Sequence, residues 1–104
     1  MRKKQTRNEF RKYKKNGHPA YIYEKVGDKF RFLGITHSDV GEGVTKIRLE
    51  VNPNPEDKKP VYMKKTSEID KVNRFGNVKK GWKLSEKDFE KVKKIRSAPG
   101  KSQK

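Results

Sequence analysis

The sequence predicts a small α+β domain, in which an antiparallel sheet of three to four strands packs against a C-terminal helix. Residues 20–37 hold two runs rich in aromatic and β-branched side chains on either side of Gly27-Asp28, the pattern of a β-hairpin. Residues 44–51 alternate apolar and charged side chains, as a strand with one buried face does. Residues 85–96 begin with a serine cap and carry apolar side chains at helical spacing. The length of 104 residues allows one domain, and an SH3-like barrel is one form that such a sheet could take.

A short basic helix is expected before the hairpin, over residues 7–15. Its start has the spacing of a capping box, and Phe10 and Tyr13 lie three residues apart on one helical face. Asn16-Gly17 would end this helix, because glycine suits the left-handed C-terminal cap. A helix of this length is unstable alone in water, so we expect it to dock through its two rings or to fold on a partner.

The hairpin turn sets the pairing of the two central strands. A two-residue loop at Gly27-Asp28 places Glu24 opposite Arg31, and these opposite charges support the register. Continued without interruption, the register sorts the side chains into two faces. The aliphatic face is Ala20, Ile22, Leu33 and Ile35, and the aromatic face is Tyr21, Tyr23, Phe30 and Phe32 with Lys25. We expect the aliphatic face to be core, and the aromatic face to be either core or a binding surface.

The remaining elements follow the hairpin in order. The strand at residues 44–51 would bury Thr45, Ile47, Leu49 and Val51. A short fourth strand is expected at residues 61–65, whereas residues 66–81 are ambiguous. The C-terminal helix would bury Phe89, Val92 and Ile95 and be anchored by Trp82.

The net charge of +16 is unevenly distributed. Residues 1–15 carry +7, residues 16–78 carry +2 and residues 79–104 carry +7. We expect a basic arm with the short helix at residues 1–16, a single domain at residues 17–96 and a disordered basic tail at residues 97–104. Cationic flanks repel each other and favour an anionic partner, of which nucleic acid is the commonest.

The composition excludes several other classes of protein. The chain has no cysteine, and its two histidines are too few for a histidine-rich metal site. No run approaches the roughly 20 apolar residues of a membrane-spanning helix, and neither flank has the broad apolar face that binds a membrane surface. We therefore expect a protein with no cofactor, no metal and no membrane partner.

Non-enzymatic nucleic-acid binding is the leading functional prediction, with DNA or RNA as the partner. Bases could stack on the rings of the hairpin while neighbouring cations meet phosphates. Cations at alternate positions of a strand can also follow a phosphate backbone. The predicted contact residues are Arg2, Lys3, Lys4, Arg7, Arg11, Lys12, Lys14, Lys15, Tyr21, Tyr23, Lys25, Lys46, Arg48, Lys64 and Lys65.

Two other functions stay open. One is a small protein–protein interaction module or inhibitor, which would present an apolar patch on the sheet. The other is a metal-independent ribonuclease, because such chemistry needs only a few basic and phenolic side chains around one phosphate. His37, Arg48 and Tyr62 are its candidate residues.

Three short stretches resemble uncharacterised small basic proteins of bacterial mobile elements. They are Gly17-His18-Pro19-Ala20-Tyr21, Gly34-Ile35-Thr36-His37-Ser38 and Asn52-Pro53-Asn54-Pro55-Glu56-Asp57, and the resemblance covers about residues 17–85. It implies a bacterial cytoplasmic setting and a role near DNA transfer, replication or host defence. It implies no site residues.

Overall fold

The hairpin around Gly27-Asp28 forms the centre of the sheet. In the computed structural model, which describes residues 4–96, strands β2 (Pro19–Val26) and β3 (Lys29–Thr36) pair antiparallel. Gly27 has a φ of 62°, which favours glycine, and Glu24 lies opposite Arg31 with 2.9 Å between the Arg31 Nε and the Glu24 Oε1. The predicted turn and the pairing next to it are therefore confirmed.

A bulge at Tyr23 changes the pairing farther along the hairpin. Glu24 faces Arg31, but Ile22 already faces Phe32, so β2 contains one extra residue. Beyond the bulge every pair is shifted by one position from the predicted register. Because a one-residue shift exchanges the faces, Tyr21 and Tyr23 lie with Leu33 and Ile35. Ala20 and Ile22 lie with Phe30 and Phe32, and both faces of the hairpin are buried.

The predicted N-terminal helix is wrong, because these residues form strand β1 (Lys4–Tyr13). Strand β1 pairs with β2 along most of its length, and this pairing satisfies backbone groups that a short isolated helix could not keep protected. Residues three apart lie on opposite faces of a strand, so Phe10 and Tyr13 enter two different cores. Gly17, with a φ of 76°, forms part of the turn into β2.

The two predicted strands after the hairpin are present but short. They are β4 (Lys46–Arg48) and β5 (Tyr62–Lys64), and β5 pairs with the end of β3. Strand β4 ends early because the N–H groups of Glu50 and Val51 donate to the carboxylate of Asp88. Val51 is consequently exposed rather than buried, whereas Leu49 is core as predicted.

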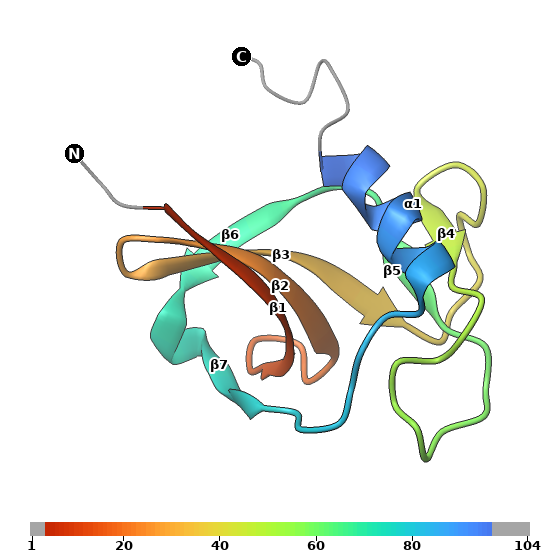
Figure 1. The fold of residues 1–104 in the computed structure, drawn as a ribbon, viewed down its shortest axis with the longest axis horizontal. Helices are drawn as coiled ribbons and strands as arrows, with labels where there is room; N and C mark the ends of the chain where they lie inside the picture. The colour runs from red at the N-terminus through yellow and green to blue at the C-terminus, as the bar shows by residue number, and fades with distance from the viewer. Residues whose placement is uncertain (1–3, 97–104) are drawn as a thin grey trace.

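The ambiguous segment forms two more strands around a short 3-10 helix. They are β6 (Glu68–Lys71), η1 (Val72–Arg74) and β7 (Phe75–Val78). Within residues 4–96 the sheet therefore has seven strands, in the order β4-β5-β3-β2-β1-β7, with β6 on the first half of β3. The sheet curls, as Figure 1 shows, but β6 and β7 do not pair in this part of the chain. The small antiparallel sheet is confirmed, but it has more strands than expected and does not close as an SH3-like barrel.

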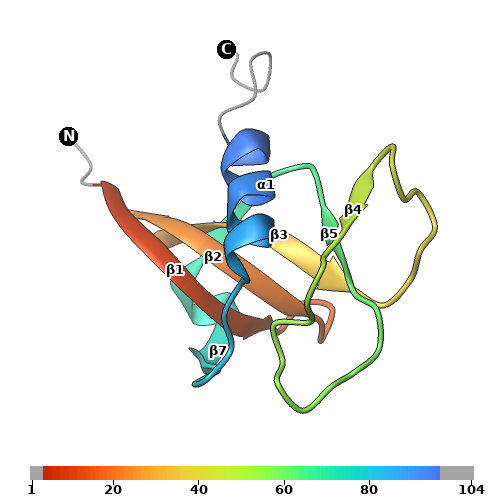
Figure 2. The same ribbon diagram turned by 45° about the vertical axis from the view of Figure 1, so that its right-hand side comes forward.

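Helix α1 (Glu86–Arg96) confirms the predicted C-terminal helix. Its N-terminus is capped by Ser85, whose Oγ accepts the Asp88 N–H at 3.2 Å. Val92 is buried and Ile95 and Trp82 pack beside it, whereas Phe89 is half-buried outside this cluster and Asp88 is buried instead. Figure 2 shows α1 standing over one face of the sheet, between the β1–β2 side and the β4–β5 side. No helix in the described residues is long and apolar enough to cross a membrane.

Two cores hold the fold together. The helix-side core lies under α1 and consists of Phe10, Tyr21, Tyr23, Leu33, Ile35, Leu49, Val61, Met63 and Val92. The inner core lies within the curl of the sheet and consists of Tyr13, Ala20, Ile22, Phe30, Phe32 and Phe75. The inner core is mainly aromatic, with the Tyr13 and Phe75 rings stacked at a centroid distance of 5.0 Å.

Candidate nucleic-acid interface

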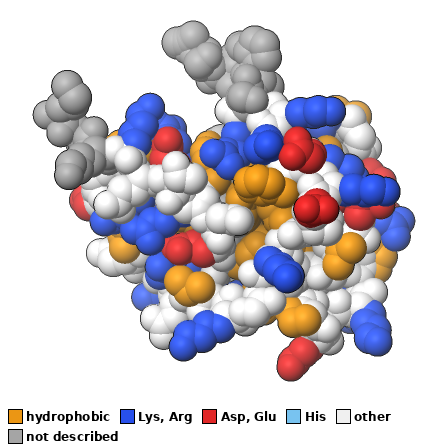
Figure 3. Space-filling model, viewed as in Figure 1, with side chains coloured by type: hydrophobic (Ala, Val, Ile, Leu, Met, Phe, Trp, Pro, Cys, Tyr) orange, Lys and Arg blue, Asp and Glu red, His pale blue; other side chains and the backbone are white. Residues whose placement is uncertain are grey.

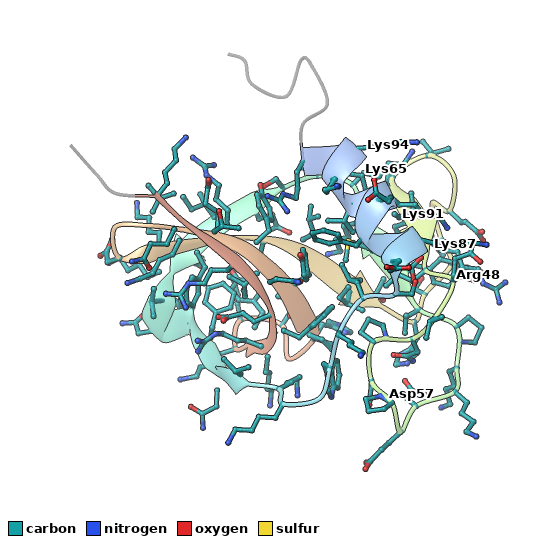
Figure 4. The ribbon with its side chains drawn as sticks, viewed as in Figure 1. Arg48, Asp57, Lys65, Lys87, Lys91 and Lys94 are labelled. Carbon is teal, nitrogen blue, oxygen red and sulfur yellow. The ribbon has the colours of Figure 1, made fainter. Side chains whose placement is uncertain are left out.

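Cations from three segments gather on one side of the molecule. Lys87, Lys91 and Lys94 follow one another at helical spacing, so they form one stripe along α1. Figure 4 shows this stripe in a row with Arg48 of β4 and with Lys65, which follows β5. In Figure 3 basic side chains line this part of the surface, with acidic side chains among them. We call Arg48, Lys65, Lys87, Lys91 and Lys94 the helix ridge.

Lys91 joins the helix to the edge of the sheet. Its Nζ lies 3.0 Å from Glu50 Oε2, donates to the carbonyl of Arg48 at 3.4 Å and lies 3.8 Å from Asp88 Oδ1. The pKa of Glu50 is lowered by the hydrogen bond and the charge of Lys91, and further by the charges of Lys87 and Arg48. Glu50 is thus ionised near neutral pH, and several ridge cations act on this one exposed carboxylate.

Asp88 fixes the position of the helix ridge through hydrogen bonds to the backbone that follows β4. Its side chain is fully buried and accepts the Glu50 N–H at 2.8 Å and the Val51 N–H at 3.1 Å. These bonds fix α1 against the chain that follows β4, which sets Arg48 beside the helix stripe. Sequence reasoning recognised Asp88 only as an acid in the first turn. The signal that it faces inward is its spacing from Val92 and Ile95, at i, i+4 and i+7.

The predicted basic arm is divided by the structure. Arg2 and Lys3 lie outside the described residues, and Lys4, Lys12, Lys14 and Lys15 are exposed. Arg7 and Arg11 instead flank Glu9, at 3.7 Å and 2.7 Å, and their guanidinium groups lie over the ring of Phe30. Two of the arm's arginines therefore already have partners within the folded sheet.

The predicted strand cations are also separated. Arg48 and Lys65 belong to the helix ridge, whereas Lys46 and Lys64 face each other across β4 and β5. Side chains alternate along a strand, so Lys46 and Lys64 point away from the helix-side core, and so does Arg48; what ties Arg48 to the ridge is its position at the end of β4, where its charge acts on Glu50. Lys46 Nζ donates to the carbonyl of Ser38 at 3.3 Å, and Lys25 is half-buried on β2, away from this edge of the sheet.

The predicted stacking platform is wrong, because Tyr21 and Tyr23 are core residues. Tyr21 is fully buried, and burial raises the pKa of its phenol to about 12. Its hydroxyl donates to Asn8 Oδ1 at 2.8 Å. Tyr23 is 8% exposed, and its hydroxyl is hydrogen-bonded to Ser67. Neither ring offers a face to a base, because the bulge turned both residues toward the helix-side core.

The three candidate ribonuclease residues take different places. Tyr62 is buried in β5, opposite both Thr36 and Arg48. His37 is exposed, and its Nε2 lies 2.7 Å from Asp57 Oδ2. This bond and the N–H of Lys59 lower the pKa of Asp57 to about 2. The structure therefore ties His37 to the loop between β4 and β5 rather than to the other two side chains.

That loop surrounds a shallow hollow of about 350 Å³. Asn52, Asn54 and Asp57 each accept the N–H group two residues ahead, which stiffens the loop. The hollow is lined by acidic, basic and proline side chains, so its charge does not favour one class of ligand. Among residues 4–96 no group of three histidine or acidic side chains could hold a metal ion.

Comparisons with protein-family models, with curated proteins and with solved structures found no match to this chain. The resemblance to mobile-element proteins therefore stays a prediction, and the function rests on the geometry of the helix ridge.

Proposed function

We propose that this chain binds nucleic acid through phosphate contacts made by the helix ridge. The observation that carries the proposal is the convergence of Arg48, Lys65 and the α1 stripe on one side, where their charges outnumber the exposed acids Glu50, Glu86 and Glu90. Like charges held close together cost folding free energy, which an anionic polymer would recover on binding. Lysine is a compact point charge suited to phosphate oxygens.

The proposal sets the strength of the salt dependence. If all five ridge cations neutralise one phosphate each on a duplex, the slope of log K against log salt is about −4.5. Raising the salt concentration from about 50 to about 200 mM should then weaken binding roughly 500-fold. Exposed lysines elsewhere add attraction at long range, but they contribute less to this slope.

A triple variant tests the ridge directly. Lys87→Ala, Lys91→Ala and Lys94→Ala together remove three charges and keep a good helix former at each position. The slope should fall to about −1.8, and the loss between the two salt concentrations to roughly tenfold. The measurement is fluorescence anisotropy with a labelled oligonucleotide, and circular dichroism checks that the variant is folded.

A matched control removes the same charge elsewhere. Lys12→Ala, Lys14→Ala and Lys15→Ala change three exposed lysines at the end of β1 and its turn. This control should keep most of the wild-type slope. Absence of binding by the wild type at about 50 mM salt would refute the proposal, as would equal losses in both triple variants.

A further inference from the structure

We infer that the helix ridge recognises double-stranded DNA, through its phosphates and without reading the base sequence. This inference rests on the proposed function and narrows it to one form of nucleic acid. Three features of the described residues carry it: the aromatic rings at the surface, the way the ridge charges are held, and the shape of the helix that presents them.

The aromatic rings that reach the surface are covered by cations. Lys79 Nζ lies 4.9 Å from the centre of the Trp82 ring, and Lys93 Nζ lies 5.4 Å from that of Phe89. The ring of Tyr23, which is buried, is covered in the same way by the guanidinium of Arg96, 4.8 Å from its centre. A base would have to displace these cations in order to stack. Proteins that hold single strands gain about 1–3 kcal/mol of binding free energy per base from stacking, and this surface has no open ring to provide it.

The helix that carries the stripe is held in a fixed place, and so is one of its charges. Lys91 has three oxygen partners in the protein, and the buried carboxylate of Asp88 fixes the helix that carries the stripe. From Lys87 to Lys94 the stripe advances about 10 Å along the helix axis. A rigid array of charges suits a rigid array of phosphates, whereas a flexible single strand would lose conformational entropy on matching it. This favours a duplex.

The helix shape distinguishes DNA from RNA duplexes. Helix α1 has 11 residues and stands out from the sheet, so it is about 16 Å long with a convex outer surface. The major groove of B-form DNA is about 12 Å wide and admits a helix, whereas that of A-form RNA is too deep and narrow. Arg48, whose carbonyl accepts a hydrogen bond from Lys91, lies beside the stripe, where the phosphates that border the groove would lie. In the view of Figure 4 Lys65 lies in line with the stripe, and its Nζ donates to the carbonyl of Gly43 at 3.3 Å.

The side chains of the stripe argue against base recognition. Lysine or arginine can donate to guanine, but telling all four base pairs apart also requires acceptors or amides, such as those of asparagine, glutamine or a carboxylate. The stripe on α1 contains only lysines. We therefore expect binding to be independent of sequence.

The test is a competition experiment with the whole chain. A labelled duplex of about 16 base pairs is bound at low salt and displaced by titration with unlabelled competitors, whose concentrations are expressed per anionic charge. The competitors are duplex DNA of two unrelated sequences, single-stranded DNA, duplex RNA and heparin. Duplex DNA should displace the label at about tenfold lower concentration than the other polyanions, and the two DNA sequences should agree within about threefold.

The outcomes separate this inference from the proposed function. Equal or better displacement by single-stranded DNA, duplex RNA or heparin would overturn the preference for duplex DNA, while binding through the ridge would stand. A difference of more than about tenfold between the two DNA sequences would overturn the absence of base reading. If no nucleic acid binds at all, the proposed function itself fails.

Discussion

The buried carboxylate of Asp88 is the point where the fold and the helix ridge depend on each other, and its substitution is the most informative perturbation. Asp88→Asn preserves the shape of the side chain, but its amide can accept only one of the two N–H groups and turns a donor toward the other. The charge that faces Lys91 at 3.8 Å is also lost. Helix α1 should then be held less firmly against the end of β4.

The expected loss of stability follows from the two hydrogen bonds. A hydrogen bond to a charged group is worth about 1.5–3 kcal/mol, and Asp88→Asn removes one and weakens the other. Glu50 and Val51 are exposed residues, so water can partly satisfy a freed N–H group. We therefore expect a loss of about 2 kcal/mol in the free energy of unfolding, and of about 3 kcal/mol for Asp88→Ala. For a domain of this size, 2 kcal/mol lowers Tm by about 8–16 °C.

Urea unfolding followed by circular dichroism measures the loss. Glu90→Gln is the matched control, because Glu90 lies on the same helix and makes an exposed ion pair with Lys93. This control should change the free energy of unfolding by less than about 0.5 kcal/mol. A change of similar size in Asp88→Asn would refute the argument that the carboxylate holds the helix.

Three further predictions concern single sites. His37→Ala should raise the pKa of Asp57 from about 2 toward its ordinary value, as measured by NMR titration of the carboxyl group. In the wild type, the stabilisation that the His37–Asp57 bond provides should be lost as the pH falls toward 2 and Asp57 becomes protonated. Burial and the hydrogen bond to Asp70 raise the pKa of the Tyr13 phenol to about 12. In an ultraviolet titration this phenol should therefore stay un-ionised at a pH where free tyrosine has already lost its proton. Titration at the pKa of free tyrosine would contradict the burial of Tyr13. Gly41→Ala should lower stability more than Gly43→Ala in urea unfolding: both have positive φ values, but only at Gly41 would a Cβ atom overlap a neighbouring side chain.

The parts of the fold that depend on nearby residues were predictable. The turn at Gly27-Asp28 and the cap at Ser85 use local chemistry, and both are confirmed. The bulge at Tyr23 was not predictable in this way, because β2 keeps its alternation on both sides of the extra residue. The shifted register brings Tyr21 into the core beneath α1, a contact with residues far away in the sequence.

The N-terminal error has a similar cause. Phe10 and Tyr13 satisfy a helical spacing, but the same spacing places them on opposite faces of a strand. A sequence pattern that contains two apolar residues cannot distinguish one buried face from two. Residues 4–13 form a strand rather than a helix because the edge of β2 provides backbone hydrogen bonds to them.

The candidate site was predictable only in its chemistry. The sequence indicates an excess of cations, and two of the predicted residues, Arg48 and Lys65, do lie on the helix ridge. The lysines of the stripe on α1 were not among the predicted contact residues. The importance of the stripe depends on β4 lying beside the helix, which results from the hydrogen bonds of Asp88 and could not be deduced from spacing alone.

The structure also changes what the net charge means. Several cations lie over rings or beside acids, as Arg11 does over Phe30 and next to Glu9, and these contacts belong to the folded state. Such cations contribute to stability through packing and are poorly placed to meet a ligand. On the helix ridge Lys91 is likewise paired with Glu50 and Asp88, whereas Lys87 and Lys94 are exposed and make no ion pair within residues 4–96. A total of +16 therefore overstates the charge available for binding, and the arrangement around α1 is the better guide to where an anionic partner would lie.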